Sequence, residues 1–133
     1  MEQKQQELIV LITDDEQGIL DLLESELREL DKNIKIIKTN NGYDALHKIQ
    51  NGHIDFLISD VSMPDMNGKE LYNRVKQIRP QLPIIMMTGF GYDPNHTILD
   101  LKKLGLKHVI AKPFDTNRLL TMIYEMMNQS DIL

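Results

Sequence analysis

Polar residues that could do phosphoryl chemistry follow the apolar segments of this 133-residue sequence. Asp14 and Asp15 follow the first such segment, Asp60 the third, Thr88 the fourth and Lys112 the fifth. Carboxylate oxygens suit a hard cation such as Mg²⁺, which commonly binds one or two carboxylates together with a phosphate. An Asp oxygen can attack a phosphoryl group, and an ammonium or hydroxyl group can bind the phosphoryl oxygens. Gathered in one place, these side chains could hold Mg²⁺ and accept a phosphoryl group.

Five short segments rich in Ile, Val and Leu must position these residues, and each has the composition of a β-strand. They are Leu8 to Ile12, Ile34 to Ile37, Phe56 to Ile58, Ile84 to Met87 and Val109 to Ala111. Apolar residues at helical spacing follow each of them. These residues are Ile19, Leu20, Leu23, Leu27 and Leu30; Ala45, Leu46 and Ile49; Leu71, Val75 and Ile78; Ile98, Leu101 and Leu104; and Leu119, Ile123 and Met126. Strand and helix therefore alternate five times.

Such an alternation predicts a parallel sheet with helices on both faces, and hence an α/β domain of three layers. For the flavodoxin-like strand order 2-1-3-4-5, the order reverses between strands one and three, where ligands bind at the carboxyl ends. Adjacent strands lie roughly 4.8 Å apart, so Asp14 and Asp15 would lie beside Asp60. Three carboxylates so close repel one another, and either Lys112 or a divalent cation could compensate their charge.

Length and composition narrow the function classes. A chain of 133 residues fits one domain, and without cysteine it has no disulfide framework, thiolate zinc site or cysteine nucleophile. The net charge of −5, with no cluster of Lys and Arg, argues against nucleic acid as a direct partner. The apolar segment from Leu8 to Ile12 is too short for a signal sequence or membrane span, so we expect a cytoplasmic protein without membrane insertion.

Four motifs give the sequence a resemblance to a known family. They are Thr13-Asp-Asp-Glu16, Asp60-Val-Ser-Met-Pro-Asp-Met-Asn-Gly68, Met87-Thr-Gly89 and Lys112-Pro-Phe114. Together, from about residue 8 to 128, they resemble the receiver domain of two-component response regulators, as found in chemotaxis regulators and hybrid sensor kinases. Each motif alone is weak, whereas the ordered set is specific. We expect the receiver domain to occupy residues 7–128, with tails at 1–6 and 129–133.

The resemblance implies a role for each candidate residue. Asp60 would be the phosphoacceptor, Thr88 the switch hydroxyl and Lys112 a phosphate-binding group. Mg²⁺ would be held by Asp14, Asp15, Asp60 and the backbone carbonyl of Ser62. The resemblance also implies a cis peptide bond between Lys112 and Pro113, which only an X-Pro junction adopts at low cost.

The resemblance further implies a phosphorelay. The donor would be a sensor histidine kinase or a histidine-phosphotransfer protein, and an unidentified effector would read the fourth helix, fifth strand and fifth helix. Val109 occupies the position where the family usually has Tyr or Phe, and its short β-branched side chain cannot make the same rotamer swing. The sequence leaves the output mechanism open, as well as whether the protein forms a homodimer. It also leaves open whether the chain is a stand-alone regulator or a piece of a hybrid kinase.

Two other functions share parts of this pattern. A magnesium-dependent aspartyl phosphohydrolase of the haloacid dehalogenase type has a second Asp two residues after its nucleophile, where this chain has Ser62 and therefore lacks the general acid. A flavodoxin-like cofactor binder would need a glycine-rich phosphate loop, but the loop from Thr13 to Gly18 is acidic. Taken singly, Asp14 or Asp15 is more often a helix N-cap and Asp60 a turn residue. Only their joint position indicates a site.

Overall fold

Five apolar segments pair into one parallel sheet in the computed structural model of the protein, which describes residues 7–89 and 97–131. The strands are β1 (Leu8–Thr13), β2 (Ile34–Thr39), β3 (Phe56–Asp60), β4 (Ile84–Gly89) and β5 (Val109–Lys112). Their order is β2-β1-β3-β4-β5, and every neighbouring pair is parallel. The predicted flavodoxin-like order is thereby confirmed. The predicted tail at residues 1–6 lies outside the described part of the chain.

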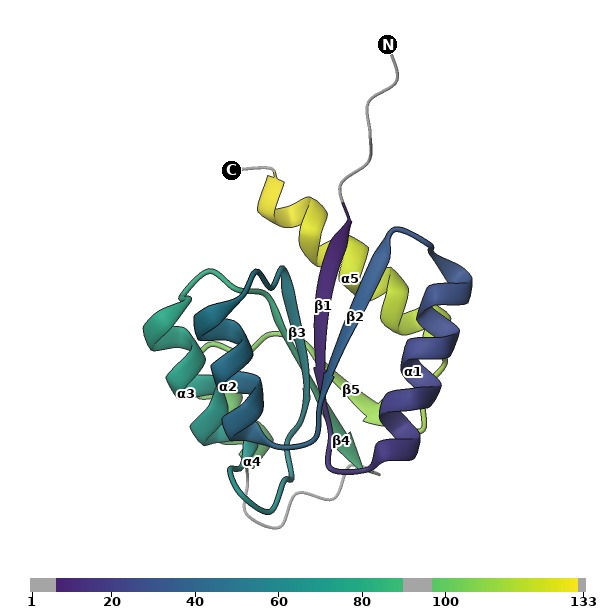
Figure 1. Ribbon diagram of the computed structural model, residues 1–133. Helices are drawn as coiled ribbons and strands as arrows, with labels where there is room; N and C mark the ends of the chain where they lie inside the picture. Colours follow the sequence, from purple (N-terminus) through teal and green to yellow (C-terminus); the bar gives the residue numbers. More distant parts are fainter. Residues whose placement is uncertain (1–6, 90–96, 132–133) are drawn as a thin grey trace.

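Helices cover both faces of the sheet and enclose two separate cores (Figure 1). The helices are α1 (Gln17–Leu30), α2 (Gly42–Asn51), α3 (Gly68–Ile78), α4 (Thr97–Lys103) and α5 (Thr116–Asp131). Helices α1 and α5 pack on one face, whereas α2, α3 and α4 pack on the other. None of the described helices has both the length and the hydropathy that a membrane span requires.

The apolar periodicity identifies the inward faces of the helices, except at their ends. In α5, Leu119 and Ile123 are fully buried, as the spacing predicts. By contrast, Leu30, Ile78 and Leu104 follow the same spacing but are 44%, 39% and 48% exposed. The first two are the last residues of α1 and α3, and Leu104 follows the end of α4. At these points the chain turns toward the next strand, so the helical pattern no longer directs a side chain into the core.

All five strands extend further toward their carboxyl ends than the apolar pattern predicts, and three of them thereby include candidate residues. Asp60 is the last residue of β3, Thr88 lies within β4 and Lys112 ends β5. Their pairing continues the parallel ladder, with Asp60 opposite Met87 and Thr88 opposite Ala111. Ladder hydrogen bonds are made by the backbone and do not need apolar side chains. The three candidate residues are therefore held by the sheet and not by flexible loops.

Gly68 begins α3 where the backbone of the preceding loop comes very close. Its N–H donates to the Val61 carbonyl at 2.8 Å, and a Cβ at this position would lie 2.8 Å from the Val61 Cα. We expect Gly68→Ala to lower the free energy of unfolding by roughly 1–3 kcal/mol, because backbone atoms must shift. Urea denaturation measures the change. The matched control is Gly18→Ala in α1, where nothing lies within 4 Å of the added Cβ and the helix should be no less stable. Similar effects of the two substitutions would contradict this account.

Candidate functional site

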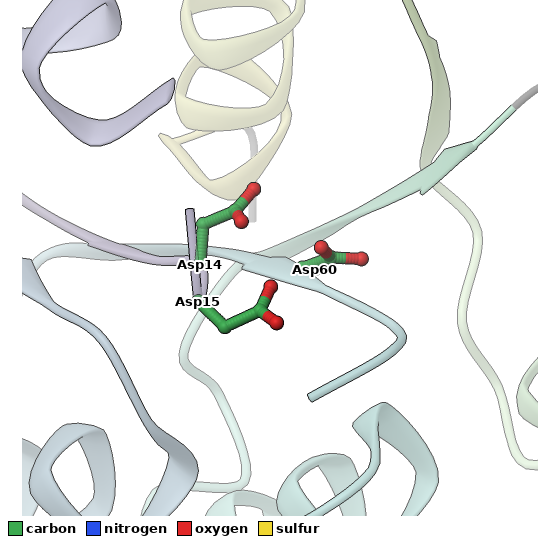
Figure 2. Close-up of side chains that lie close together, drawn as sticks. All are labelled: Asp14, Asp15 and Asp60. Carbon is green, nitrogen blue, oxygen red and sulfur yellow. The ribbon is translucent and has the colours of Figure 1, made fainter. Parts of the chain in front are cut away.

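Three carboxylates meet at the carboxyl edge of the sheet. Asp14 and Asp15 follow β1, and Asp60 ends the neighbouring strand β3. One oxygen from each carboxylate lies within 4.8 Å of the others, and Figure 2 shows the three side chains grouped together. The strand order brings them together, because Thr13, just before the acidic pair, is paired with Ser59, just before Asp60.

Lys112 reaches this acidic cluster from the end of β5. Its Nζ donates to Asp14 Oδ2 at 2.7 Å and to Asp60 Oδ2 at 3.1 Å. Asp14 is fully buried and Asp60 is 7% exposed, so neither charge is well solvated. The Lys112 ammonium therefore compensates two buried negative charges, as the sequence led us to expect of it.

Burial and neighbouring charges set the protonation of the site. Burial raises the pKa of the Asp60 carboxyl; the Ser62 amide, which donates to Asp60 Oδ1 at 3.1 Å, and the Lys112 charge oppose this rise only in part. For Lys112, burial lowers the pKa of the ammonium, but its bonds and ion pairs with Asp14 and Asp60 outweigh this and leave the pKa raised. Lys112 is thus firmly protonated, while ionising Asp60 is harder than ionising an ordinary Asp.

Asp14 and Asp15 differ in their surroundings. Asp14 Oδ1 accepts a hydrogen bond from the Glu16 amide at 2.9 Å, in addition to its ion pair with Lys112. Asp15 is exposed, and within residues 7–89 and 97–131 no hydrogen bond or ion pair engages its carboxylate. The N-cap position of α1 is Glu16, without a side-chain cap bond, so the alternative reading of Asp14 or Asp15 as the N-cap is wrong. The Asp15 carboxylate is available for a ligand.

The remaining predicted residues lie in or directly after β4 and β5, and Val109 is the first residue of β5. Thr88 is buried in β4, one residue beyond Met87, the pairing partner of Asp60. Val109 is half-buried and packs against the core on the α2, α3 and α4 face. The peptide bond between Lys112 and Pro113 is cis, as predicted.

Two contacts at the site were not predicted from the sequence. The hydroxyl groups of Thr13 and Thr39 form a buried hydrogen bond of 2.8 Å at the ends of β1 and β2. The Asp65 carboxylate accepts hydrogen bonds from the first two amides of α2. The register of β1 with β2, which places Thr13 opposite Thr39, was the available signal for the first contact. The second joins a loop to a distant helix and has no local signal.

The donor set fits a hard divalent cation. The clustered atoms are carboxylate oxygens, with no sulfur or nitrogen ligand among them. Mg²⁺ prefers oxygen ligands, needs few carboxylates and keeps positions for water or phosphate oxygens. Asp14, Asp15 and Asp60 could therefore hold Mg²⁺ and leave room for an anionic group beside Lys112.

Residues 10–124 match the family described as the response regulator receiver domain. The uncharacterized transcriptional regulatory protein YesN of Bacillus subtilis is 30% identical over 119 residues, which make up 89% of this chain and 32% of that protein. The autoinducer 1 sensor kinase/phosphatase LuxN of Vibrio harveyi is 30% identical over 121 residues, or 91% of this chain and 14% of that protein. This chain thus spans about a third or less of the length of these relatives.

Solved structures of response regulators are also similar to this chain. A CheY-like receiver domain protein from Methanospirillum hungatei superposes with a TM-score of 0.85 at 27% identity, covering 94% of this chain and 97% of that one. The response regulator TrrA of Thermotoga maritima, solved in complex with Mg²⁺ and BeF, has a TM-score of 0.77 at 28% identity, covering 90% and 98%. Both are similar to this chain along nearly their whole length.

Proposed function

Because this chain belongs to the family of response regulator receiver domains, we propose that it accepts a phosphoryl group on Asp60, with Mg²⁺ held by Asp14, Asp15, Asp60 and the Ser62 carbonyl. The observation that carries this proposal is the cluster of three carboxylates at one sheet edge, with Lys112 paired to two of them. The donor would be a histidine kinase or a histidine-phosphotransfer protein. This would make the chain the phosphoacceptor of a two-component phosphorelay.

The proposed chemistry is an in-line displacement at phosphorus. An Asp60 carboxylate oxygen forms a bond to phosphorus while the bond from phosphorus to the donor atom breaks, and the donor leaves with its electron pair. Lys112, already 3.1 Å from Asp60 Oδ2, binds the phosphoryl oxygens, and the Thr88 hydroxyl donates to one of them. Bound Mg²⁺ supplies positive charge that offsets the negative charge gathered at the site.

Phosphorylation would change the charge of the site and so the pairing of Lys112. A phosphoryl group adds roughly −1.5 to −2 charges, by analogy with other phosphorylated residues. Lys112 now divides its bonds between Asp14 and Asp60, and it would turn to the phosphoryl oxygens. We propose that this change is read through the face formed by α4, β5 and α5, where Val109 stands in place of the usual aromatic residue. The effector could lie in the same protein or in a separate one.

We further propose that the chain is a phosphoacceptor and does not turn over exogenous phosphate esters. Ser62 stands two residues after Asp60, where a phosphohydrolase of the haloacid dehalogenase type has its general acid. A serine hydroxyl cannot protonate a leaving group as a carboxylic acid does.

Incubation with acetyl phosphate tests the first statement, and incubation with a generic phosphate ester tests the second. With Mg²⁺, the intact protein should gain the mass of one phosphoryl group, and with EDTA it should gain none. The protein should release inorganic phosphate no faster than its own phosphoryl group is slowly hydrolysed. A protein that stays unmodified in the presence of Mg²⁺ would contradict the phosphoacceptor role. Rapid phosphate release from a generic ester would favour the phosphohydrolase instead.

A further inference from the structure

The loop between β3 and α3, residues 61–67, is fastened to the start of α2 by Asp65. Asp65 Oδ1 accepts a hydrogen bond from the Gly42 amide and Oδ2 accepts one from the Tyr43 amide, each at 3.2 Å. These amides belong to the first turn of α2, where backbone donors have no partner within the helix. The local cap, Asn41, satisfies only the Asp44 amide. A residue 22 positions away thus completes the capping of α2.

The same loop is also fixed at its base and beside Asp65. At its base, the Gly68 amide donates to the Val61 carbonyl at 2.8 Å. Beside Asp65, the buried Met66 packs against α2 so closely that a Cβ on Gly42 would lie 2.7 Å from the Met66 Cβ. Glycine at this position allows the loop and the helix to approach each other. Ser62 lies in the short stretch between the base of the loop and the Asp65 anchor.

We propose that Asp65 is a positioning residue for the metal site, because it holds the loop that presents the Ser62 carbonyl. This inference rests on the proposed function, in which that carbonyl binds Mg²⁺. Residues 61–67 lie outside the strands and helices. Besides the two bonds to Asp65, the Val61 amide donates to the Met87 carbonyl at 3.0 Å and the Ser62 amide donates to Asp60 Oδ1 at 3.1 Å. Asp65 is thus one of the few anchors that together determine where the Ser62 carbonyl lies. Asp65 acts through the loop. Partners that orient metal ligands in this way typically change metal affinity by about 10-fold to 100-fold when they are replaced.

Isothermal titration of the full chain with MgCl₂ tests the inference. We expect Asp65→Ala to raise the Kd for Mg²⁺ roughly 10-fold. Asp65→Asn keeps the size of the side chain and one acceptor oxygen, so it should lose less affinity than Asp65→Ala. The matched control is Asp44→Ala. This substitution also removes one negative charge, here from the first turn of α2, together with the hydrogen bond that the Asn41 side chain donates to Asp44. It leaves the loop of residues 61–67 untouched. Its Kd should stay within about twofold of that of the unaltered protein.

Two further readouts separate positioning from other effects. Thermal unfolding in EDTA should show small, similar losses for Asp65→Ala and Asp44→Ala, since each weakens the start of one helix. A purely Coulombic effect of Asp65 should vanish as salt rises from about 0.1 M to about 1 M, because the Debye length falls from about 10 Å to about 3 Å. A positioning effect should persist at both salt concentrations.

The outcomes distinguish this inference from the function on which it rests. Equal Mg²⁺ affinities for Asp65→Ala and the unaltered protein would overturn the inference and leave the proposed function standing. Equal losses of Mg²⁺ affinity in Asp65→Ala and Asp44→Ala would do the same. So would a loss of Mg²⁺ affinity in Asp65→Ala that vanishes at high salt. An unaltered protein that binds no Mg²⁺ would overturn both.

Discussion

Asp60→Asn is expected to abolish phosphorylation by acetyl phosphate and occupation by beryllofluoride. The substitution keeps the size of the side chain and its place at the end of β3, but the neutral amide cannot attack phosphorus. Intact-mass measurement after incubation with acetyl phosphate and Mg²⁺ shows directly whether the variant is phosphorylated. The control is Asp100→Asn in α4, where the carboxylate forms a surface ion pair with Lys69 at 3.4 Å and should have no effect on phosphorylation. Undiminished labelling of Asp60→Asn would place the phosphoacceptor elsewhere.

The same variant should be more stable than the unaltered protein when no metal is bound. Burial raises the pKa of Asp60 above its ordinary value of 3.8, so the folded state binds this proton more tightly than the unfolded chain does. Ionised Asp60 therefore lowers the free energy of unfolding, and the loss develops as pH rises from 3.8 through the raised pKa. In EDTA at neutral pH, Asp60→Asn should have the higher Tm. Below pH 3.8 the two proteins should converge.

Asp15→Asn is expected to weaken Mg²⁺ binding by on the order of 100-fold or more, beyond the usual effect of residues that only orient ligands. The carboxylate is exposed, and within the described residues it makes no bond that the fold would lose. The Tm in EDTA should therefore stay unchanged. Isothermal titration and thermal unfolding measure the two quantities separately.

Glu16→Gln is the matched control for Asp15→Asn. Glu16 is the next residue, is also exposed and makes no side-chain cap bond to α1. Its replacement removes an equal charge close to the cluster. A similar loss of Mg²⁺ affinity in both variants would show that Asp15 acts only through its charge and is not a ligand.

The gathering of the acidic residues could be predicted because it depends on strand order alone. Nearly continuous apolar strands indicated helices on both faces, and in the flavodoxin-like order that we expected for such a sheet, β1 and β3 are neighbours. The ends of those strands carry Asp14, Asp15 and Asp60, so no side-chain detail was needed to bring them together. Lys112 could be predicted as the compensating charge for the same reason, since it ends another strand at the same edge.

Other features depended on contacts that have no local sequence signal. The apolar pattern stops before Asp60 and Lys112, although backbone pairing carries β3 and β5 through both residues. The contact of Asp65 with α2 depends on how a loop without regular structure folds back across 22 residues of sequence. Periodicity also failed at Leu30, where α1 ends.

The most direct test of the account identifies the modified residue itself. The protein is phosphorylated with acetyl phosphate and Mg²⁺, the acyl phosphate is reduced with borohydride, and the modified side chain is located by peptide mass spectrometry. The account predicts that Asp60 alone is reduced and that EDTA prevents the reaction. Reduction of Asp14 or Asp15 in place of Asp60, or the same labelling of Asp60 without Mg²⁺, would contradict it.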